Sequence, residues 1–444
     1  MAQASLYRNR RRARRCPTRR GRATGSRIVH IAVIGSGVSG LTAAYLLSRS
    51  HQVDLYEAES RLGGHAHTHI VRRNGIDWPV DTGFLVFNER TYPNFIALLG
   101  QLGVPSQPTD MSFSVRCRRC GIEYASRSMG SLFAQRRRLF DLGHLRMLAE
   151  IPRYFRYARR FLASDAGFDV PLGAFLDSHA VSDVLRRHFV LPMGGAIWSA
   201  SFADMLDAPA RTILQFYENH GLLAVDGAPP WRTVTGGSRQ YVGALARRVS
   251  GSIRLGQPVS RILRSADGVE LDIVGDGRTS VDAVVVATHA DTALGMLADA
   301  DRGERDALSA FRYSVNHTVL HTDVRVLPRT PRAWAAWNCD VHDCRDWSAP
   351  VSMTYDVTQL QQVGGPERFC VTLNGTHTPT GGAIAEMRYA HPILDRAAVA
   401  AQAKVRELNG RRRTYFCGAH LRFGFHEDGV VSALDVAAHF GERL

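Results

Sequence analysis

Three glycines near the N-terminus have the spacing of a phosphate-binding turn. Gly35, Gly37 and Gly40 follow the apolar, β-branched run 28–34, and a good helix pattern over 41–47 comes directly after them. In such a unit the first glycine makes the tight turn, the second lets the backbone approach a pyrophosphate, and the third lets the helix pack on the strand. The N–H groups at the start of the helix favour the phosphates. The stretch therefore predicts a dinucleotide site.

An acidic residue at the end of the next strand-like run supports this prediction. Residues 53–56 have the composition of a second strand, and Glu57 follows them, 22 positions after Gly35. This is close to the spacing expected for an acid that holds a ribose hydroxyl. Arg61 and the doublet Gly63–Gly64 come within the next few residues.

This extended pattern resembles the signature of the flavin amine oxidase, protoporphyrinogen oxidase and phytoene desaturase superfamily. The resemblance implies FAD rather than NAD as the cofactor, with the glycine doublet making a second close approach to the diphosphate. It also implies an α/β fold in which a Rossmann-type FAD-binding domain carries an inserted α+β substrate domain.

The C-terminal block contains a second candidate anchor. Residues 414–419 predict a strand that reaches Gly418, and the turn at 424–429 opens the last helix with Asp428 and Gly429 at its start. An acid–glycine pair there offers backbone N–H groups to an anion. The resemblance implies that this helix start contacts the ribityl chain and the pyrimidine edge of the flavin. Relatives commonly have Gly-Asp where this chain has Gly418-Ala419, so a ribityl contact is either missing or supplied by Asp428.

The predicted cofactor residues come from these motifs, from a turn at 77–84 that the resemblance places near the isoalloxazine ring, and from a valine that relatives use to contact the adenine through its backbone. They are Gly35, Ser36, Gly37, Ser39, Gly40, Glu57, Ala58, Arg61, Gly63, Gly64, His65, Thr82, Gly83, Val259, Gly418, Glu427, Asp428, Gly429 and Val430.

The chain is long enough, at 444 residues, for two or three domains. A buried-strand pattern recurs after a long helical excursion with many arginines, and a strand-rich excursion precedes the last helix. We therefore expect an FAD-binding domain from 28–88, 225–300 and 404–444, and a substrate domain from 89–224 and 301–403.

Most of the formal charge of +14 comes from residues 1–27, which hold ten arginines and no acidic residue. We expect this Arg-rich tail to be disordered. No apolar segment of signal-peptide type follows it, so we expect a cytoplasmic protein. The favoured interpretation is a solvated tail or a translation start placed too far upstream, rather than a segment that contacts nucleic acid or anionic lipid. Nucleic acid is therefore not an expected partner.

Membrane association remains an alternative for one helix. No run of eighteen apolar residues occurs, so no spanning helix is expected. The expected helix 144–162 has an apolar stripe beside several arginines. Such a helix can lie on an anionic membrane, which would place the protein peripherally at its inner face, but more often it packs on its own domain.

The seven cysteines include one CxxC motif, Cys117 to Cys120. A CxxC motif can be half of a zinc site or a redox pair. Because no second CxxC follows at ordinary spacing, we expect a hairpin turn between 113–115 and 122–124, and no metal site.

A flavin held by these motifs accepts a hydride from a carbon that the protein positions against its ring. Many amine oxidases of the superfamily hold a lysine through water to the reactive flavin nitrogen. The only lysine here is Lys404, on an expected helix before the last strand, where it is poorly placed for this role. Residues 81–88 and 424–429 resemble signatures of bacterial FAD-binding proteins linked to fatty-acid modification. The resemblance therefore favours an apolar or lipid substrate.

Candidate catalytic residues are few. An aliphatic desaturase needs mainly an apolar tunnel and at most one base, for which His426 is the best candidate because its unperturbed pKa suits either role. The alternative is that His426 bonds a loop carbonyl. Tyr355 and Trp198 are weaker candidates; Trp198 belongs to an apolar, Gly-punctuated loop at 191–199 that either lines a pocket or lies buried between domains.

We therefore expect an FAD-dependent oxidoreductase that removes a hydride from a lipid acyl or isoprenoid chain and passes electrons to an unknown acceptor. A flavin-dependent double-bond isomerase, in which the hydride leaves and returns, and an amine oxidase are the alternatives. A non-enzymatic membrane or nucleic-acid adaptor that uses the basic tail is the third.

Overall fold

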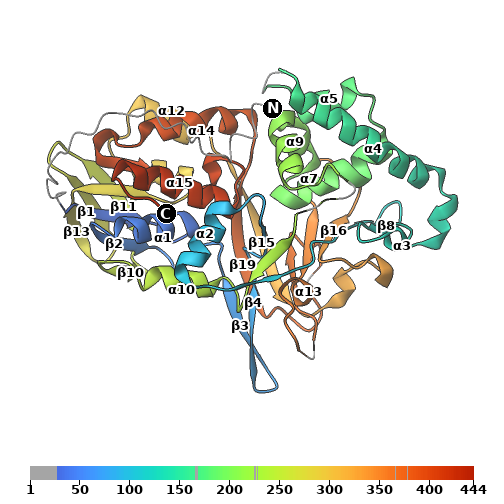
Figure 1. Ribbon diagram of the computed structural model, residues 1–444, viewed down its shortest axis with the longest axis horizontal. Helices are drawn as coiled ribbons and strands as arrows, with labels where there is room; N and C mark the ends of the chain where they lie inside the picture. Colours follow the sequence, from blue (N-terminus) through green and yellow to red (C-terminus); the bar gives the residue numbers. More distant parts are fainter. Residues whose placement is uncertain (1–27, 166–168, 225–226, 228, 366, 378) are drawn as a thin grey trace, which may run out of the picture.

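The structure is a computed structural model, and it describes residues 28–165, 169–224, 227, 229–365, 367–377 and 379–444. The Arg-rich tail lies outside the described residues. Figure 1 shows two connected parts, a parallel sheet with its covering helices and a larger sheet covered by a second group of helices. No helix in the described part of the chain is both long and apolar enough to cross a membrane.

A five-stranded parallel sheet carries the glycine turn at the end of its first strand. The strand order is β10 (Ile253–Leu255), β2 (Gln52–Glu57), β1 (His30–Ile34), β14 (Ala283–Val286) and β20 (Thr414–Phe416). The central strands are β-branched runs buried on both faces, which is typical of a parallel sheet between two layers. The predicted Rossmann-type α/β class is confirmed.

Alternate residues of β1 face two different layers. Ile31 and Val33 pack on one layer, whereas Ala32 and Ile34 pack on the other. The first layer consists of α1 (Val38–Leu47), α2 (Pro93–Leu102), α10 (Arg239–Ala246) and α15 (His426–His439). The second consists of β11 (Val259–Arg264), β12 (Val269–Ile273), β13 (Gly277–Val281), α11 (Ala290–Met296), α12 (Arg302–Leu308) and α14 (Arg396–Leu408).

A seven-stranded sheet forms the other part. Its order is β19 (Ala385–Pro392), β15 (Tyr313–His321), β18 (Cys370–Leu373), β17 (Ser352–Asp356), β16 (Trp337–Val341), β7 (Phe113–Cys117) and β8 (Ile122–Ala125). The largest apolar cluster joins this sheet to a helical layer of α4 (Leu142–Ala163), α5 (Leu172–Ser178), α6 (Asp183–Leu185), the π-helix η3 (Arg186–Val190), α7 (Leu191–Trp198), α8 (Phe202–Asp207) and α9 (Ala210–Asn219).

Short elements connect these layers. They are β3 (Thr68–Arg73), β4 (Ile76–Asp81), β5 (Phe87–Asn88), β6 (Ser106–Pro108), β9 (Trp231–Val234), α3 (Met129–Leu132), α13 (Val357–Gln361) and the 3₁₀ turns η2 (Arg136–Phe140), η4 (Val324–Val326), η5 (Pro331–Ala333), η6 (Arg411–Arg413) and η7 (Ala419–Leu421).

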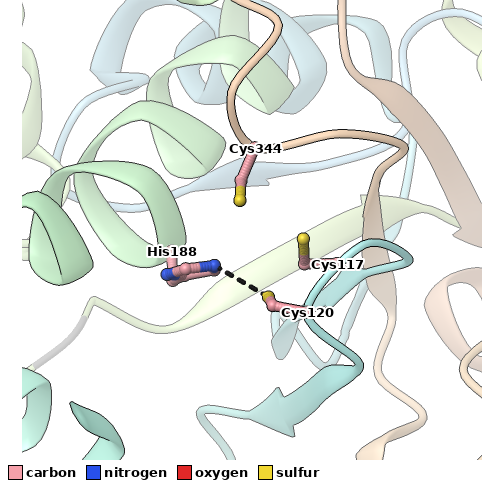
Figure 2. Close-up of side chains that lie close together, drawn as sticks. All are labelled: Cys117, Cys120, His188 and Cys344. Carbon is pink, nitrogen blue, oxygen red and sulfur yellow. Dashed lines mark hydrogen bonds between the residues drawn. The ribbon is translucent and has the colours of Figure 1, made fainter.

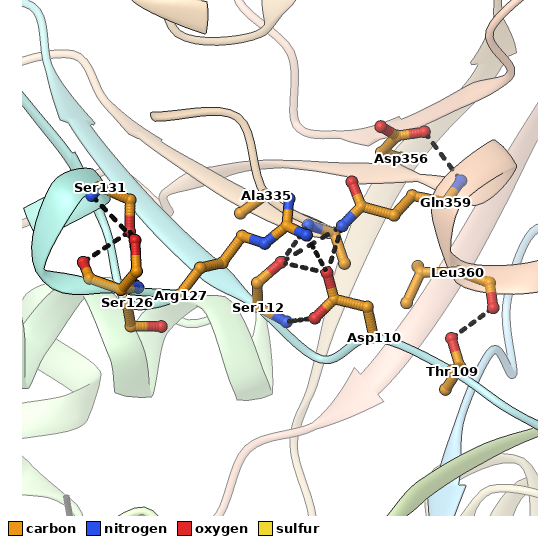
Figure 3. A network of polar contacts seen from close by, with 12 residues as sticks. Thr109, Asp110, Ser112, Ser126, Arg127, Ser131, Ala335, Asp356, Gln359 and Leu360 are labelled. Carbon is orange, nitrogen blue, oxygen red and sulfur yellow. Dashed lines mark hydrogen bonds and ion pairs between the residues drawn. The ribbon is translucent and has the colours of Figure 1, made fainter. Parts of the chain in front are cut away.

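A polar network holds the segment in which the chain crosses from β6 to β7 (Figure 3). Asp110 accepts hydrogen bonds from Ser112 and from Gln359 of α13, and Arg127 lies 3.5 Å from its carboxylate. The hydroxyl of Thr109 donates to the carbonyl of Leu360. This crossing is therefore bound to α13 rather than left as a free linker.

Two expectations about local structure have clear outcomes. The CxxC stretch is a hairpin, as predicted, because β7 and β8 pair antiparallel around it. The expected loop at 191–199 is wrong, since these residues form α7. Its glycines allow close helix packing: a Cβ on Gly194 would lie 2.5 Å from Cε of Met205.

The domain boundaries remain a proposal, and α2 suggests one change to them. The predicted boundary after residue 88 assigns α2 to the substrate domain. Phe95, Leu98 and Leu102 of α2 pack in the same apolar cluster as α1 and α15. We therefore propose that the FAD-binding part extends through residue 102.

Candidate active site

The glycine turn is shaped by close backbone packing on two sides. Gly35 has a φ of +98°, and a Cβ on it would lie 3.0 Å from the carbonyl oxygen of Ala287. A Cβ on Gly40 would lie only 1.9 Å from the carbonyl oxygen of Gly35. A Cβ on Gly37, in contrast, would meet no protein atom within 4 Å. The open space over the start of α1, where no side chain caps the helix, suits a phosphate group.

The glycine doublet lies against this turn. Gly63 and Gly64 have φ values of +111° and +56°, and a Cβ on Gly64 would lie 3.2 Å from Cα of Gly37. The N–H of Gly63 donates to the carbonyl of Ser36 at 3.0 Å. Arg61 donates to the carbonyl of Gly64 at 2.9 Å, which fixes the loop. The two glycine motifs thus border one space, as expected of two approaches to one diphosphate.

Glu57 is fixed at the end of β2. The N–H and hydroxyl of Ser36 donate to one of its carboxylate oxygens at 2.8 and 2.5 Å, and the N–H of Glu59 donates to the other at 2.9 Å. Ala58 is exposed beside it. The N–H of Gln257 donates to the carbonyl of Glu57 at 3.0 Å, so the segment that leads to Val259 passes this end of the sheet.

The start of α15 meets the start of α1. A Cβ on Gly429 would lie 2.6 Å from Cγ1 of Val38 and 2.8 Å from Oγ of Ser39. Val430 is buried in the same apolar cluster, and the N–H of Gly418 donates to the hydroxyl of Ser432 on α15 at 2.9 Å. The two predicted anchors, distant in sequence, therefore form one site.

The hydrogen bonding of the Asp428 carboxylate is a separate indication of whether this site fits FAD. One carboxylate oxygen accepts the N–H of Phe425 at 3.0 Å, whereas Oδ1 is buried and forms no hydrogen bond with any described residue. Burial raises the pKa of Asp428 to about 7. An unpaired buried oxygen is costly, and a ligand hydroxyl would satisfy it. The open glycine turn, the uncapped helix and this oxygen all fit the phosphates and hydroxyls of FAD.

The carboxylate of Glu427, a predicted cofactor residue, is bound within the protein. Its carboxylate accepts hydrogen bonds from the backbone N–H of Asn94 at 3.1 Å, from the amide of the same residue at 2.6 Å, and from the N–H of Phe95 at 2.9 Å. It thus caps the N-terminus of α2, whose own N-cap residue provides no side-chain bond. Only the backbone of Glu427 is left for the cofactor.

The predicted turn at Thr82 and Gly83 holds His65. The N–H of Phe84 donates to the carbonyl of His65 at 2.9 Å, and a Cβ on Gly83 would lie 2.1 Å from that oxygen. The hydroxyl of Thr82 lies 2.7 Å from the hydroxyl of Tyr389 on β19. The turn therefore brings the FAD-binding motifs to the edge of the seven-stranded sheet.

A group of half-buried histidines surrounds His65 and was not predicted. Its ring centroid lies 5.1 Å from Tyr389, 5.5 Å from His391 and 6.1 Å from His289. Burial lowers the pKa of His65 and His289, and it lowers the pKa of His391 to about 4. These imidazoles are therefore neutral at physiological pH. Nε2 of His65 has no hydrogen-bond partner among the described residues.

His391 is held by residues from two other elements. Its Nδ1 lies 3.0 Å from the hydroxyl of Ser199, at the end of α7, and 3.3 Å from the side-chain nitrogen of Asn316 on β15. The amide hydrogens of Asn316 have nearer acceptors in the carbonyls of Ser314 at 3.0 Å and Tyr389 at 3.2 Å, so the hydroxyl of Ser199 is the main partner of Nδ1. Ser199 adopts a left-handed φ of +52°, a conformation that is concentrated at functional sites. No local motif joins residues 199, 316 and 391.

The structure does not favour the acid–base role predicted for His426. Its ring stacks on Phe84 at 3.5 Å, and Nε2 lies 3.0 Å from the hydroxyl of Tyr241. Burial lowers its pKa to about 3, much as it does for His391, so the distinction rests on this packing of the ring and of Nε2. His426 is packed in the aromatic core under α15, because the helix start turns this side chain toward α10.

The other two catalytic candidates lie in apolar surroundings. Tyr355 packs edge-on against Trp337 at 4.8 Å within the seven-stranded sheet, and burial raises its pKa. Trp198 donates to the carbonyl of Phe423 at 3.1 Å and packs near Phe216 and Phe425. Trp198 is therefore part of an aromatic wall, next to Ser199 of the His391 group.

A small pocket continues from this wall. Its lining is largely apolar and consists of Trp198, Ala200, Asp204, Met205, Ala208, Ile213, Pro392, Ile393 and Leu394. Because Pro392 and Ala200 directly follow His391 and Ser199, the pocket adjoins the polar group described above. Lys404 is exposed on α14.

Comparisons with known proteins agree with the FAD-binding motifs described above. The family profile described as flavin containing amine oxidoreductase matches residues 38–347. An L-amino-acid oxidase from Siganus canaliculatus is 25% identical over 331 residues, which cover 66% of this chain and 56% of that protein. This chain thus spans about half the length of that relative. Protoporphyrinogen oxidase 2 from Arabidopsis thaliana is 43% identical over 75 residues, 17% of this chain and 14% of that protein.

Solved structures share the fold at low sequence identity. A fatty acid isomerase from P. acnes that produces CLA has a TM-score of 0.67 and 16% identity, over 94% of this chain and 99% of that one. A putrescine oxidase double mutant has a TM-score of 0.67 and 13% identity, over 93% of this chain and 99% of that one.

Proposed function

This chain belongs to the flavin containing amine oxidoreductase family, and we propose that it is an FAD-dependent oxidoreductase that removes a hydride from an apolar lipid chain. The observation that carries the proposal is the composition of the site beside the FAD anchors. The groups that surround His391 are neutral imidazoles, a hydroxyl and an amide, next to the aromatic wall of Trp198, Phe216 and Phe425. An uncharged, apolar substrate fits these surroundings.

When bound, FAD would accept a hydride from the substrate carbon. Formation of a carbon–carbon double bond also releases one proton from the neighbouring carbon. We propose that Ser199 and His391 receive it: Oγ of Ser199 lies 3.0 Å from Nδ1 of His391, and in the tautomer with the ring proton on Nε2 a proton taken up at Oγ can pass to Nδ1. Because burial lowers the pKa of His391 to about 4, the imidazole is a neutral but weak base, and its position beside the hydroxyl of Ser199 carries the assignment.

Replacing His391 by phenylalanine is expected to slow flavin reduction by about 100-fold or more, because positioned proton transfer contributes factors of this size. The measurement is anaerobic bleaching of the bound flavin by phospholipid-derived fatty acids. His321→Gln, a buried histidine bonded to Thr372 on the neighbouring strand, is the matched control and should reduce flavin normally. His426→Phe should also stay within a few-fold of wild type. Unchanged bleaching in His391→Phe contradicts the assigned role.

Lipid analysis tests the substrate class. Cells that express the chain should contain unsaturated acyl species that matched cells without it lack. The same lipids should bleach the purified flavoprotein. Bleaching by amines or L-amino acids, with no response to lipids, would contradict the proposal.

Two other reactions each have one supporting observation. A double-bond isomerase is favoured by the fold shared with a fatty acid isomerase, and turnover without consumption of an electron acceptor would select it. Amino-acid oxidation is favoured by the similarity to an L-amino-acid oxidase. The exposed position of Lys404 argues against a mechanism that uses a lysine near the flavin.

We also propose a peripheral membrane contact for one end of the helical layer. The body of α4 packs on its own domain through Met147, Tyr154, Phe155 and Ala158. Its N-terminal end differs, since Phe140 and Leu142 are 87% and 81% exposed. Leu139 and Leu145 are also exposed, among the exposed arginines Arg136, Arg137 and Arg146. Apolar side chains surrounded by arginines suit the surface of an anionic bilayer.

Phe140→Asp is expected to lower binding to vesicles of anionic phospholipid by about tenfold or more, because it removes an apolar anchor and adds a negative charge. Vesicle co-sedimentation measures this. Leu255→Asp, at a half-exposed apolar position on the parallel sheet, is the control and should bind as wild type does. Equal binding of the Phe140 variant and the wild type would contradict the contact.

A further inference from the structure

Four potential metal ligands converge beside the β7–β8 hairpin of the seven-stranded sheet (Figure 2). They are the sulfurs of Cys117, Cys120 and Cys344 and a ring nitrogen of His188, and all lie within 4.8 Å of one another. A tetrahedral zinc ion with Zn–S bonds of about 2.3 Å and a Zn–N bond of about 2.0 Å needs ligand separations of about 3.6–3.8 Å. Small side-chain rotations would therefore bring the four atoms to these distances.

His188 presents the correct nitrogen for coordination. Its Nδ1 lies 3.2 Å from the carbonyl of Val184, so Nδ1 carries the proton and donates. Nε2 is then an unprotonated donor atom, 3.1 Å from Sγ of Cys120. A metal-binding histidine usually has its second nitrogen fixed in this way. His188 also lies in a π-helix, and such segments occur frequently at functional sites.

The CxxC hairpin keeps its two sulfurs clear of the arginines between them. Arg118 pairs with Asp340, with Nε 2.9 Å from a carboxylate oxygen, and Arg119 pairs with Asp343 at 2.9 Å. Both guanidinium groups are thereby bound outside the ligand group.

We propose that Cys117, Cys120, His188 and Cys344 bind one structural Zn²⁺ ion. Three thiolates and one imidazole are a standard zinc ligand set, and four protein ligands leave no open position for catalysis. All six described cysteines are free thiols, so none of the three sulfurs is committed to a disulfide. The sequence provides only one CxxC; the other two ligands come from distant segments.

The ion would join three segments that are far apart in the chain. Cys117 and Cys120 belong to the β7–β8 hairpin, His188 lies just before α7, and Cys344 follows β16. The helix that begins three residues after His188 ends at Trp198, beside Ser199 of the candidate active site. Zinc would thus hold α7 against the edge of the sheet and so support the candidate active site. The zinc site itself does not depend on the proposed function.

The full-length wild-type protein, purified without chelator, should contain about one zinc ion per chain by inductively coupled plasma mass spectrometry. Replacing the zinc by Co²⁺ should give the thiolate-to-cobalt charge-transfer band of a tetrahedral site. Cys120→Ser and Cys344→Ser should lower zinc affinity by about tenfold or more. Cys370→Ala, a buried cysteine on β18, is the control and should keep the full zinc content.

Two results on the wild-type protein would overturn the proposal even if a cysteine variant fails to fold. One is negligible zinc together with no cobalt charge-transfer band. The other is a Cys117–Cys120 disulfide, detected by mass spectrometry in protein purified from a reducing cytoplasm. Such a disulfide would identify the two cysteines as a redox pair instead of zinc ligands. Neither readout depends on the substrate or on turnover.

Discussion

Alanine at Gly40 is expected to destabilise the apoprotein by about 3 kcal/mol, whereas alanine at Gly37 should leave its stability within about 0.5 kcal/mol. The added Cβ at Gly40 would lie 1.9 Å from the carbonyl oxygen of Gly35, so the strand and helix must separate. The Cβ at Gly37 meets no protein atom within 4 Å. It would instead enter the space for the diphosphate, so Gly37→Ala should bind FAD weakly while folding normally.

Denaturant unfolding of the apoproteins and titration with FAD measure the two effects separately. Gly100→Ala in α2 is the control, because a Cβ there also meets no protein atom within 4 Å. That change should raise stability by about 0.5–1 kcal/mol, since it removes a glycine from a helix interior, and should leave FAD binding unchanged. If Gly37→Ala binds FAD as tightly as wild type, the phosphates do not lie over this turn.

Asp428→Asn is expected to weaken FAD binding by about 10- to 100-fold, the effect of losing a hydrogen bond to a charged group. Oδ1 of Asp428 is the buried oxygen without a partner among the described residues. A hydroxyl donor binds the ionised carboxylate best, so wild-type affinity should rise as the pH passes through about 7, the pKa of Asp428. The variant should lack this dependence. Equal affinities and equal pH profiles would exclude contact between Asp428 and FAD.

The same substitution should change how the stability of the apoprotein depends on pH. Burial raises the pKa of Asp428 from 3.8 in the unfolded chain to about 7 in the folded protein. Between these values the folded state holds a proton that the unfolded state has lost, so stability falls as pH rises from about 4 to 7. Asp428→Asn should flatten this slope. Asp81, whose pKa burial raises to about 6, contributes equally to both proteins, so their difference isolates Asp428.

The features that depend on neighbouring residues in the sequence could be predicted from local motifs. The buried strand before Gly35, the helix after Gly40 and the hairpin around the CxxC motif each follow from a few consecutive side chains. The resemblance then joined the glycine doublet to the distant turn at Asp428, and the structure places all of these around one space.

Contacts between residues that are distant in the sequence could not be predicted from such motifs. Glu427 was predicted as a cofactor contact, but its carboxylate binds the N-terminus of α2, 333 positions away. Ser199, Asn316 and His391 come from three elements, and none has a distinctive neighbourhood in the sequence. The CxxC motif appeared to lack a second pair of ligands because His188 and Cys344 meet it only after α7 and β16 pack on β7.

Titration of the full-length apoprotein with FAD tests the central claim most directly. We expect saturable binding of one FAD per chain, and release of FAD on denaturation from protein purified with its cofactor. A colourless protein that binds no added FAD while remaining folded would contradict the assignment of both glycine anchors.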